Sequence, residues 1–404
     1  MRKLSEHVAA RFSDDSVALL CPNEANHTLR GVKLYALNLP IRVVATSHPD
    51  WPDAKRFSDL TNAEIVQLYS SAFRQILQVV NEFKPDVIHV NHASYFTWIA
   101  QYINAIYGIK YLVTIHGTSL ITAAEDKRWI PLTRSALKHA TIINTVSGHT
   151  KKWFLKTFGK AGIAHKTKVI TGGIDLQTYP KELPIKIING KYHLGNKKIV
   201  IFVGKLSEHK GVNYLIKAAP NIKAEIFILG SGEGRKDLEK LAQDLGADNV
   251  HFLGYFGKEY LNELREFYRR ASVFVFPSVV DEALGLVALE AMASYTPVVA
   301  SRKGGIPLAV KNDVTGYLVR ARSAKAIAER VNYILEHPEV EERLGKAARE
   351  LVEDRFDWKK ITDRFHDYYE QTVQLGIEHR KRRKLPINVE FETLEIKKKG
   401  LDYI

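Results

Sequence analysis

Residues 271–299, ASVFVFPSVVDEALGLVALEAMASYTPVV, contain the segment that decides the fold. The run at 271–277 is apolar, β-branched and aromatic, which is typical of a parallel strand buried on both faces. Residues 286–293 are strong helix formers, and Gly285 stands directly before them. The segment therefore predicts a buried strand, a glycine turn and a helix, the unit from which α/β domains are built.

Two glutamates, Glu282 and Glu290, flank this turn, one before the helix and one inside it. Gly285 lets the backbone bring free N–H groups close to a ligand, and a helix start of this kind binds phosphate without a basic side chain. The two carboxylates would accept hydrogen bonds from two sets of sugar hydroxyls. The pattern is compatible with a nucleotide-sugar site, and equally with a capping glutamate followed by a solvated one.

The length and cysteine content of the chain set its class. With 404 residues it exceeds what one hydrophobic core usually organises, so we expect two domains. The single cysteine, Cys21, excludes an intramolecular disulfide framework and fits a reducing compartment. No apolar run reaches the about 18 residues of a membrane span, and residues 1–16 lack the apolar core of a signal peptide. We therefore expect a cytoplasmic protein.

The formal charge of +14 is unevenly distributed. Residues 101–190 contain 13 Lys and Arg but only 4 Asp and Glu, and residues 380–384 add five more basic side chains. Such clusters attract nucleic acid, anionic lipid or phosphorylated substrates. Lys152, Lys156 and Lys160 have helical spacing, which fits either a membrane-surface helix or a solvated lysine face. No aromatic-interleaved motif supports nucleic-acid binding, so we expect no nucleic-acid partner and a possible peripheral contact with an anionic membrane.

Apolar runs alternate with amphipathic segments along the whole chain, which predicts parallel strands separated by helices. A polar stretch with two prolines interrupts the pattern at 175–196 and is typical of a connection between domains. The predicted strands lie at 86–91, 111–116, 140–146, 168–171, 198–203, 225–229, 250–253, 273–276 and 297–300. Two doubly wound domains facing a cleft follow from this pattern. In the tail, Ile387, Val389 and Phe391 alternate with polar residues, which predicts a short strand or a mobile segment.

A second chemical signal follows the strand predicted at 198–203, where Gly204, Lys205 and Lys210 precede a helix. Two lysines there could converge on one diphosphate and neutralise charge on a leaving phosphate, or could be ordinary surface lysines. The segment GSGEG at 230–234 departs from the dinucleotide fingerprint, and we interpret it as a strand-to-helix turn. The sequence contains no D-x-D metal signature, so we expect neither a metal nor another cofactor.

Several motifs in one order carry a family resemblance. They are TIHGTSL at 114–120, TVSGHT at 145–150, GGIDLQTYP at 172–180, VGKLSEHKG at 203–211, the two-glutamate segment, ASRKGGIPLAV at 300–310 and VTGYLV at 314–319. Together they make the chain similar to the family 4 retaining glycosyltransferases, also called glycosyl transferases group 1, which have the GT-B fold. The resemblance implies an N-terminal acceptor-side domain at 1–178, a linker at 179–196, a donor-binding domain at 197–358, a helix crossing back at 359–376 and a basic tail at 377–404.

The resemblance also implies which residues bind the donor, a nucleotide-diphosphate sugar. These are Gly204, Lys205, Lys210, Phe256, Glu282, Gly285, Leu286, Val287 and Glu290. Glu290 would bind the ribose hydroxyls, and Glu282 the hydroxyls of the transferred sugar. Phe256 would flank the base, or is a core aromatic residue.

His116, Lys205, Lys210 and Glu282 are the implied catalytic residues. His116 would project into the cleft beside the donor sugar, or caps a strand end. The implied reaction retains the anomeric configuration by front-face attack, without metal, and the acceptor is a glycan, a lipid-linked molecule or a small molecule. Two alternatives stay open: a sugar-phosphate synthase or phosphorylase on the same fold, and a non-catalytic binding paralogue.

The N-terminus departs from the family pattern. Family members usually begin with a strand and a Gly-Gly loop before the helix that LSEHVAARF at 4–12 resembles, whereas this sequence starts at that helix. We therefore expect the first strand of the N-terminal domain to be missing, which would expose the unpaired edges of its neighbours. Tyr295 and Leu308 also replace residues usual in the family, and we expect them to alter which sugar or nucleotide fits.

Overall fold

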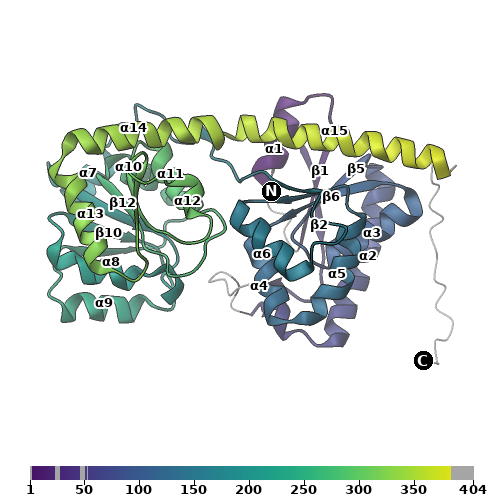
Figure 1. Ribbon diagram of the computed structural model, residues 1–404, viewed down its shortest axis with the longest axis horizontal. Coiled ribbons are helices and arrows are strands. Elements are labelled where there is room, and N and C mark those ends of the chain that lie inside the picture. Colours follow the sequence, from purple (N-terminus) through teal and green to yellow (C-terminus); the bar gives the residue numbers. More distant parts are fainter. Residues whose placement is uncertain (1, 23–27, 46–50, 52, 384–404) are drawn as a thin grey trace.

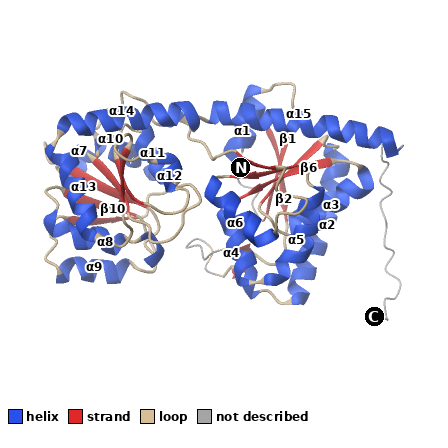
Figure 2. Ribbon diagram, in the orientation of Figure 1, coloured by secondary structure: helices blue, strands red, loops and turns tan. Residues whose placement is uncertain are grey.

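The computed structural model describes residues 2–22, 28–45, 51 and 53–383. They form two α/β domains in which parallel strands are covered by helices on both faces (Figures 1 and 2). A long pair of helices, α14 (Pro338–Arg355) and α15 (Trp358–Arg383), runs along both domains (Figure 1). The predicted fold class, two doubly wound domains, is confirmed.

The C-terminal domain contains a six-stranded parallel sheet in the order β11-β10-β9-β12-β13-β14. Its strands are β9 (Ile199–Val203), β10 (Glu225–Leu229), β11 (Val250–Gly254), β12 (Val273–Phe276), β13 (Val298–Ser301) and β14 (Gly316–Val319). All four residues of β12 are buried, because helices cover both faces of the sheet. The five strands predicted in this half of the chain are confirmed, and β14 is an additional edge strand.

Eight helices of the described chain cover this sheet: α7 (Ile187–Tyr192), α8 (Val212–Ala218), α9 (Arg235–Asp244), α10 (Leu261–Arg270), α11 (Leu286–Ala293), α12 (Ile306–Ala309), α13 (Ala324–Glu336) and α14. The GSGEG segment connects β10 to α9, as predicted. The linker prediction at 179–196 needs correction, because α7 lies within it. Ile188 of α7 is fully buried, and its N–H donates to Glu266 Oε2 over 3.0 Å, so this part of the segment belongs to the C-terminal core.

The N-terminal domain contains a four-stranded parallel sheet in the order β5-β6-β7-β8 and two separate two-stranded pairs. Its strands are β1 (Val17–Pro22), β2 (Val32–Leu37), β3 (Val43–Val44), β4 (Lys55–Arg56), β5 (Val87–Asn91), β6 (Lys110–Ile115), β7 (Ile142–Thr145) and β8 (Thr167–Val169). Its helices are α1 (Arg2–Arg11), α2 (Asn62–Phe83), α3 (Tyr95–Tyr107), α4 (Gly117–Glu125), α5 (Ile130–His139) and α6 (Gly148–Phe158). The four strands predicted here correspond to β5 to β8.

A cavity of about 2280 Å³ separates β1 from β5. Both strands line it along their whole length, together with residues of α1, α2 and α3. Within the described residues, β1 pairs with β2 and β5 pairs with β6, and no ladder joins β1 to β5. The sheet is thus interrupted where the sequence predicted a missing strand.

The C-terminal helix returns to the N-terminal domain. α15 packs on α1 through Leu4, Val8, Ile361 and Phe365, and a bidentate ion pair joins Arg11 to Asp363. The predicted helix at 359–376 is therefore found but is longer, because it begins at Trp358 and continues to Arg383. The first seven residues of the predicted tail are helical, and the predicted strand around Ile387 lies outside the described residues.

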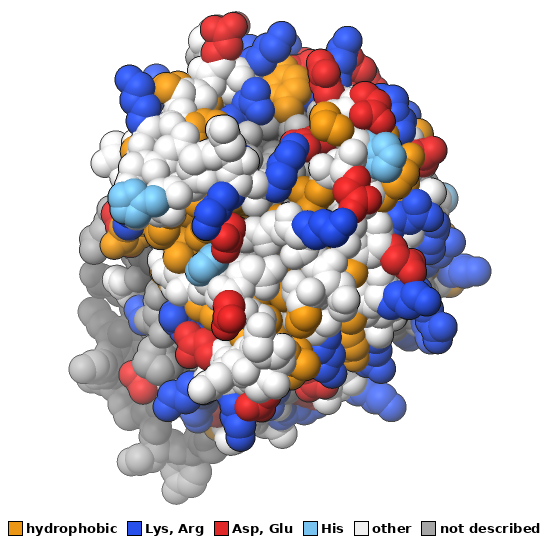
Figure 3. Space-filling model, turned by 90° about the vertical axis from the view of Figure 1, so that its left-hand side faces the viewer, with side chains coloured by type: hydrophobic (Ala, Val, Ile, Leu, Met, Phe, Trp, Pro, Cys, Tyr) orange, Lys and Arg blue, Asp and Glu red, His pale blue; other side chains and the backbone are white. Residues whose placement is uncertain are grey.

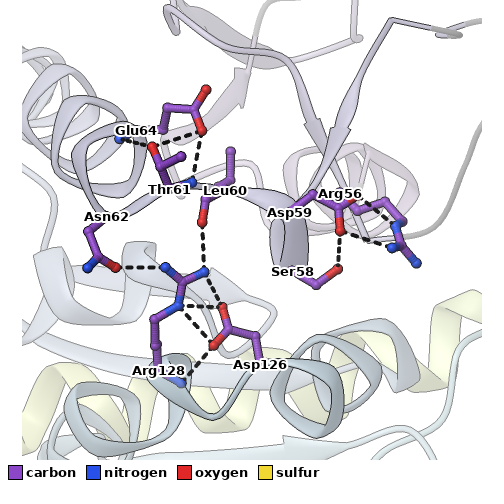
Figure 4. Close-up of polar contacts among 9 residues, drawn as sticks. All are labelled: Arg56, Ser58, Asp59, Leu60, Thr61, Asn62, Glu64, Asp126 and Arg128. Atoms are coloured by element: carbon purple, nitrogen blue, oxygen red, sulfur yellow. Dashed lines mark hydrogen bonds and ion pairs between the residues drawn. The ribbon is translucent and has the colours of Figure 1, made fainter.

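A polar network fixes the start of α2 in the N-terminal domain (Figure 4). The Arg128 guanidinium, in the 3-10 turn η2 (Lys127–Trp129), donates to the Leu60 carbonyl and to Asn62 Oδ1, both over 2.7 Å. Its Nε also donates to the Asp126 carboxylate, at 2.9 and 3.0 Å. The network joins the α4–α5 connection to the loop before α2.

Candidate functional site

The strand order of the C-terminal sheet locates a binding site. The chain proceeds from β9 outward to β10 and β11, and then returns to the other side of β9 with β12. In open α/β sheets, ligands bind at the carboxyl ends of the strands where the order reverses in this way. The loops after β9 and β12 meet there, and they contain most of the predicted site residues.

Gly211 brings these two loops into contact. It has φ 67°, and a Cβ at this position would lie 2.2 Å from the Pro277 carbonyl oxygen, so only glycine allows this approach. The loop also carries Lys205, which pairs with Glu233 over 3.3 Å. Lys210 pairs with Glu282 over 2.7 Å, across the boundary between the two loops.

Glu282 is held by three groups. Its Oε1 accepts hydrogen bonds from Lys210 Nζ at 2.7 Å and from Ser278 Oγ at 2.9 Å. Its carbonyl accepts from the N–H of Gly305 at 2.6 Å. Two donors thus fix the carboxylate through its Oε1 oxygen. Ser278 was not predicted from the sequence, because its only signal there is its place directly after the strand.

The start of α11 is a further part of the site. Gly285 is the N-cap residue with φ 87°, and a Cβ there would lie 2.7 Å from Cε1 of the buried Phe276 ring. Leu286, the first helical residue, is 49% exposed, and Val287 is half-buried. The N–H of Ala288 donates to the Gly285 carbonyl over 3.0 Å. The N–H groups at a helix start still give that end a partial positive charge, which suits an anionic ligand.

Glu290 lies one turn into α11. Its Oε2 accepts a hydrogen bond from Tyr268 Oη over 2.8 Å, and Tyr268 is fully buried in α10. Burial raises the pKa of the Glu290 carboxyl, and the Tyr268 hydrogen bond acts in the opposite direction. Tyr268 was not predicted from the sequence, because its contact with Glu290 joins two helices and leaves no local pattern.

His116 lies in the N-terminal domain, between β6 and α4. Its Nε2 is 3.3 Å from Asn91 Oδ1, and its ring centroid lies 4.6 Å from that of His92. Burial, followed by repulsion from His92, lowers the pKa of His116 to about 3, so its imidazole is neutral near pH 7. His92 has φ 69°, a strained conformation of the kind that gathers at functional sites. Neither Asn91 nor His92 was predicted.

Contacts between the domains place His116 near Glu282. A Cβ on Gly117 would lie 3.5 Å from the Cβ of Ala283, the residue after Glu282. Nearby, His149 Nε2 lies 3.6 Å from Asp281 Oδ2. The residues after β6 therefore face the Glu282 loop across the cleft.

Phe256 lies away from the loops after β9 and β12 that carry most of the predicted site residues. Phe256 packs against Tyr260 and Phe267, with ring centroids 5.5 and 5.9 Å apart, as expected of the core alternative; its contact with a base stays a prediction. Of the predicted donor residues, Leu286 and Glu290 line the large cavity, which both β1 and β5 also line.

Among the described residues, no three His, Cys, Asp or Glu side chains are grouped to hold a metal ion.

The fold and the site define a protein of the GT-B class, and the comparisons agree. The solved structure of sucrose-phosphate synthase from Thermosynechococcus elongatus matches with a TM-score of 0.75 at 24% identity, covering 92% of each chain. HepE from Anabaena, solved in complex with UDP, matches with a TM-score of 0.69 at 19% identity, covering 92% of this chain and 96% of that one.

The relatives found by sequence indicate the family, whereas the structural matches show only the fold. An uncharacterized glycosyltransferase of Methanocaldococcus jannaschii is 30% identical over 321 residues, which are 74% of this chain and 78% of that protein. The GDP-mannose-dependent alpha-(1-6)-phosphatidylinositol monomannoside mannosyltransferase of Mycobacterium tuberculosis is 30% identical over 256 residues, 59% of this chain and 65% of that protein. The family model for glycosyl transferases group 1 matches residues 185–351, and that for glycosyltransferase family 4 matches residues 61–178. The chain belongs to the glycosyl transferases group 1 family.

Proposed function

We propose that this glycosyltransferase moves a sugar, with retention of configuration and without metal or other cofactor, from a nucleotide-diphosphate sugar to a glycan, lipid-linked or small-molecule acceptor. The observation that carries the proposal is the meeting of Lys205, Lys210, Glu282 and the start of α11 at the point where the strand order reverses. Two cations, a helix N-terminus and a fixed carboxylate match a diphosphate next to a polyhydroxylated sugar.

In the proposed reaction the chain positions reactants and stabilises charge. Lys205 and Lys210 neutralise the departing diphosphate, while Glu282 orients the sugar and Glu290 the ribose. The acceptor oxygen forms its bond to the anomeric carbon on the face that the diphosphate leaves, and its proton passes to a departing phosphate oxygen. The neutral His116 can hydrogen-bond a sugar hydroxyl across the cleft.

A sugar-phosphate synthase is the second candidate. It is favoured by the alpha-maltose-1-phosphate synthase of Mycobacterium tuberculosis, which is 29% identical over 305 residues, covering 69% of this chain and 78% of that protein. The two functions share the donor site and differ in the acceptor. A non-catalytic paralogue would bind the donor without turnover.

We also propose that the protein acts in the cytoplasm and that its N-terminal domain contacts the surface of an anionic membrane. Among the described helices, none combines the length and the hydropathy that a membrane span requires. In α6 the side chains of Lys152 and Lys156 are exposed, while Phe154 and Phe158 are buried on the opposite face. The end of the C-terminal domain, by contrast, has basic and acidic side chains interspersed (Figure 3). We expect the wild-type protein to sediment with phosphatidylglycerol vesicles. The variant Lys152→Gln/Lys156→Gln should sediment with them less, and such a difference would support this contact.

Calorimetry and product analysis test the function. We expect wild type to bind one UDP- or GDP-sugar, and Glu290→Ala to bind it at least about tenfold more weakly, the loss of about one good hydrogen bond to a charged group. Transfer should continue in EDTA and give a product with the donor's anomeric configuration. An inverted product, or no donor binding by wild type, contradicts the proposal.

A further inference from the structure

Leu286 and Glu290 line the same large cavity as a group of polar residues in the N-terminal domain. These residues follow β5 or lie in the first turns of α4, and we call them the polar wall: Asn91, His92, Ser94, Thr118, Ser119 and Thr122. A second reactant has to reach a sugar held by the C-terminal domain through the space between the two domains. The polar wall is therefore the surface that such a reactant would contact.

His92 and Thr118 meet at the centre of the polar wall. Thr118 Oγ1 lies 3.2 Å from His92 Nδ1, and the ring centroid of His92 lies 4.6 Å from that of His116. In the part of the chain that the structure describes, no hydrogen bond engages His92 Nε2. This nitrogen is therefore available to a hydroxyl group of a ligand in the cavity.

The polar wall lies beside the proposed diphosphate site. A Cβ on Gly117, directly before Thr118, would lie 3.5 Å from the Cβ of Ala283. A Cβ on Gly172, in the loop after β8, would lie 3.4 Å from a methyl carbon of Leu286, the first residue of α11. Because the diphosphate is proposed to bind at the start of α11, a ligand at the polar wall would approach the sugar from the side on which the diphosphate leaves. A front-face reaction requires this approach.

The polar wall carries no formal charge. None of the cavity-lining residues between 87 and 122 is Lys, Arg, Asp or Glu. Desolvation lowers the pKa of His92 to about 4 and that of His116 to about 3, so both imidazoles are neutral near pH 7. A phosphate or carboxylate group placed there would lose hydration without meeting a cation, whereas hydroxyl groups would find hydrogen-bond donors and acceptors.

We propose that the polar wall binds an uncharged, polyhydroxylated acceptor, a sugar unit of a glycan, and that His92 contacts it. The inference rests on the proposed function, and it favours a glycan acceptor over a sugar phosphate or inorganic phosphate. His92 Nδ1–H would donate to Thr118 Oγ1, which fixes the tautomer and leaves Nε2 to accept a hydrogen bond from an acceptor hydroxyl group.

The backbone of His92 allows a variant that removes the imidazole without strain. Its φ of 69° is accessible to glycine, so we expect His92→Gly to fold. Thr118→Val removes the hydroxyl group and keeps the shape of the side chain. His165→Gly is the matched control, because His165 is an exposed turn residue of the same domain that does not line the cavity.

Binding to a glycan array tests the proposal. Each protein is saturated with the nucleotide that wild type binds, UDP or GDP, and applied to neutral, phosphorylated and carboxylated glycans. We expect wild type and His165→Gly to retain neutral glycans, and His92→Gly and Thr118→Val to retain them at least about tenfold more weakly, the loss of about one good hydrogen bond. Nucleotide affinity, measured by calorimetry, should be equal in all four proteins. Retention of charged glycans only, retention of no glycan by wild type, or equal retention by all four proteins would overturn the proposal.

Steady-state transfer separates this proposal from the proposed function. With the neutral glycan that wild type retains best, His92→Gly should raise the KM for the glycan and leave the KM for the donor unchanged. A raised KM for the donor with an unchanged KM for the glycan would contradict the role of His92. If wild type binds neither UDP nor GDP, the proposed function fails, while the array without nucleotide still tests the polar wall.

Discussion

Glu290 shows how a single buried contact can prepare a binding group. Its carboxylate accepts a hydrogen bond from the Tyr268 hydroxyl over 2.8 Å. A side chain fixed in this way loses little conformational entropy when it meets a ribose. If Glu290 binds the ribose as proposed, Tyr268 would act as a positioning residue rather than a ligand contact.

We predict that Tyr268→Phe weakens UDP binding about tenfold, since it removes a hydrogen bond to a charged group worth about 1.5–3 kcal/mol. It should also reduce the preference for UDP over 2′-deoxy-UDP, because a free Glu290 side chain no longer favours the ribose hydroxyl. The matched control is Tyr317→Phe, since Tyr317 is also buried and donates to a carboxylate, Asp313, over 2.9 Å. An unchanged preference in Tyr268→Phe, measured by calorimetry, would show that the contact is only structural.

The raised pKa of Glu290 gives a second prediction. Because the folded value lies above the ordinary value of 4.5, the folded state binds more protons than the unfolded state between the two values. The free energy of unfolding therefore falls as pH rises through this window, and the penalty is fully present above it. We predict that Glu290→Gln gains stability over wild type from pH 4 to pH 7 in urea titrations. Glu339→Gln, at an exposed site of the same domain, should not show this trend.

The surroundings of Tyr295 in the fold differ from what its place in the sequence suggested. Tyr295 was expected to alter donor fit, but it follows the C-terminal end of α11, away from Gly285, and its ring lies between Arg269 and Arg349 at 5.6 and 5.4 Å. Its φ is 64°, and the two guanidinium groups account for an aromatic residue there. The expectation about Tyr295 is not supported by its position.

At the scale of elements, burial decided what sequence could predict. Strands such as β9 and β12 are covered on both faces, so their apolar runs are continuous and were found. β1 and β2 are only half-buried, and the sequence analysis missed them. The candidate residues Lys205, Lys210, Glu282 and Glu290 could be proposed from sequence because short motifs carry them; their roles stay predictions. Ser278, Tyr268 and His92 were missed because their roles come from contacts made in the fold.

The turn before α11 gives an element-scale prediction. Gly285→Ala must accept φ 87° and push against the buried Phe276 ring, 2.7 Å from the new Cβ. We expect a loss of about 2–4 kcal/mol in the free energy of unfolding, from backbone strain and overpacking together, and weaker donor binding. Gly190→Ala in α7 is the control, because no atom lies within 4 Å of a Cβ there. Gly190→Ala should be neutral or slightly stabilising. Equal melting temperatures of Gly285→Ala and Gly190→Ala would contradict this expectation.

The polar network around Arg128 gives a second prediction at the scale of elements (Figure 4). Arg128→Ala removes the donors to the Leu60 carbonyl and Asn62. Because the arginine side chain is 42% exposed, water replaces part of the loss, and we expect about 1 kcal/mol of destabilisation. Arg74→Ala, at an exposed position within α2, should change stability by much less. Denaturant unfolding of both variants measures the difference, and equal effects would show that the network adds nothing.

At the scale of the whole molecule, the two sheets differ in continuity. The C-terminal sheet has no interruption, and β9 pairs with β10 and β12 on its two sides. In the N-terminal domain the cavity of about 2280 Å³ lies between β1 and β5, and it reaches Glu290 and Leu286 at the cleft. The N-terminal domain, which we propose to face the acceptor, is therefore the one with an open strand edge next to the candidate site.

This difference predicts uneven hydrogen exchange. Amides of β5 that point away from β6 face the cavity, and Val87, Ile88 and His89 are only half-buried there. We expect peptides covering β5 and β1 to exchange at least about tenfold faster than β7, whose residues are buried and paired with β6 and β8 in the same domain. Mass spectrometry of exchanged peptides measures this directly. Equal protection of β5 and β7 would mean that the edge of β5 is covered in solution, because an amide facing an open cavity has no partner to slow its exchange.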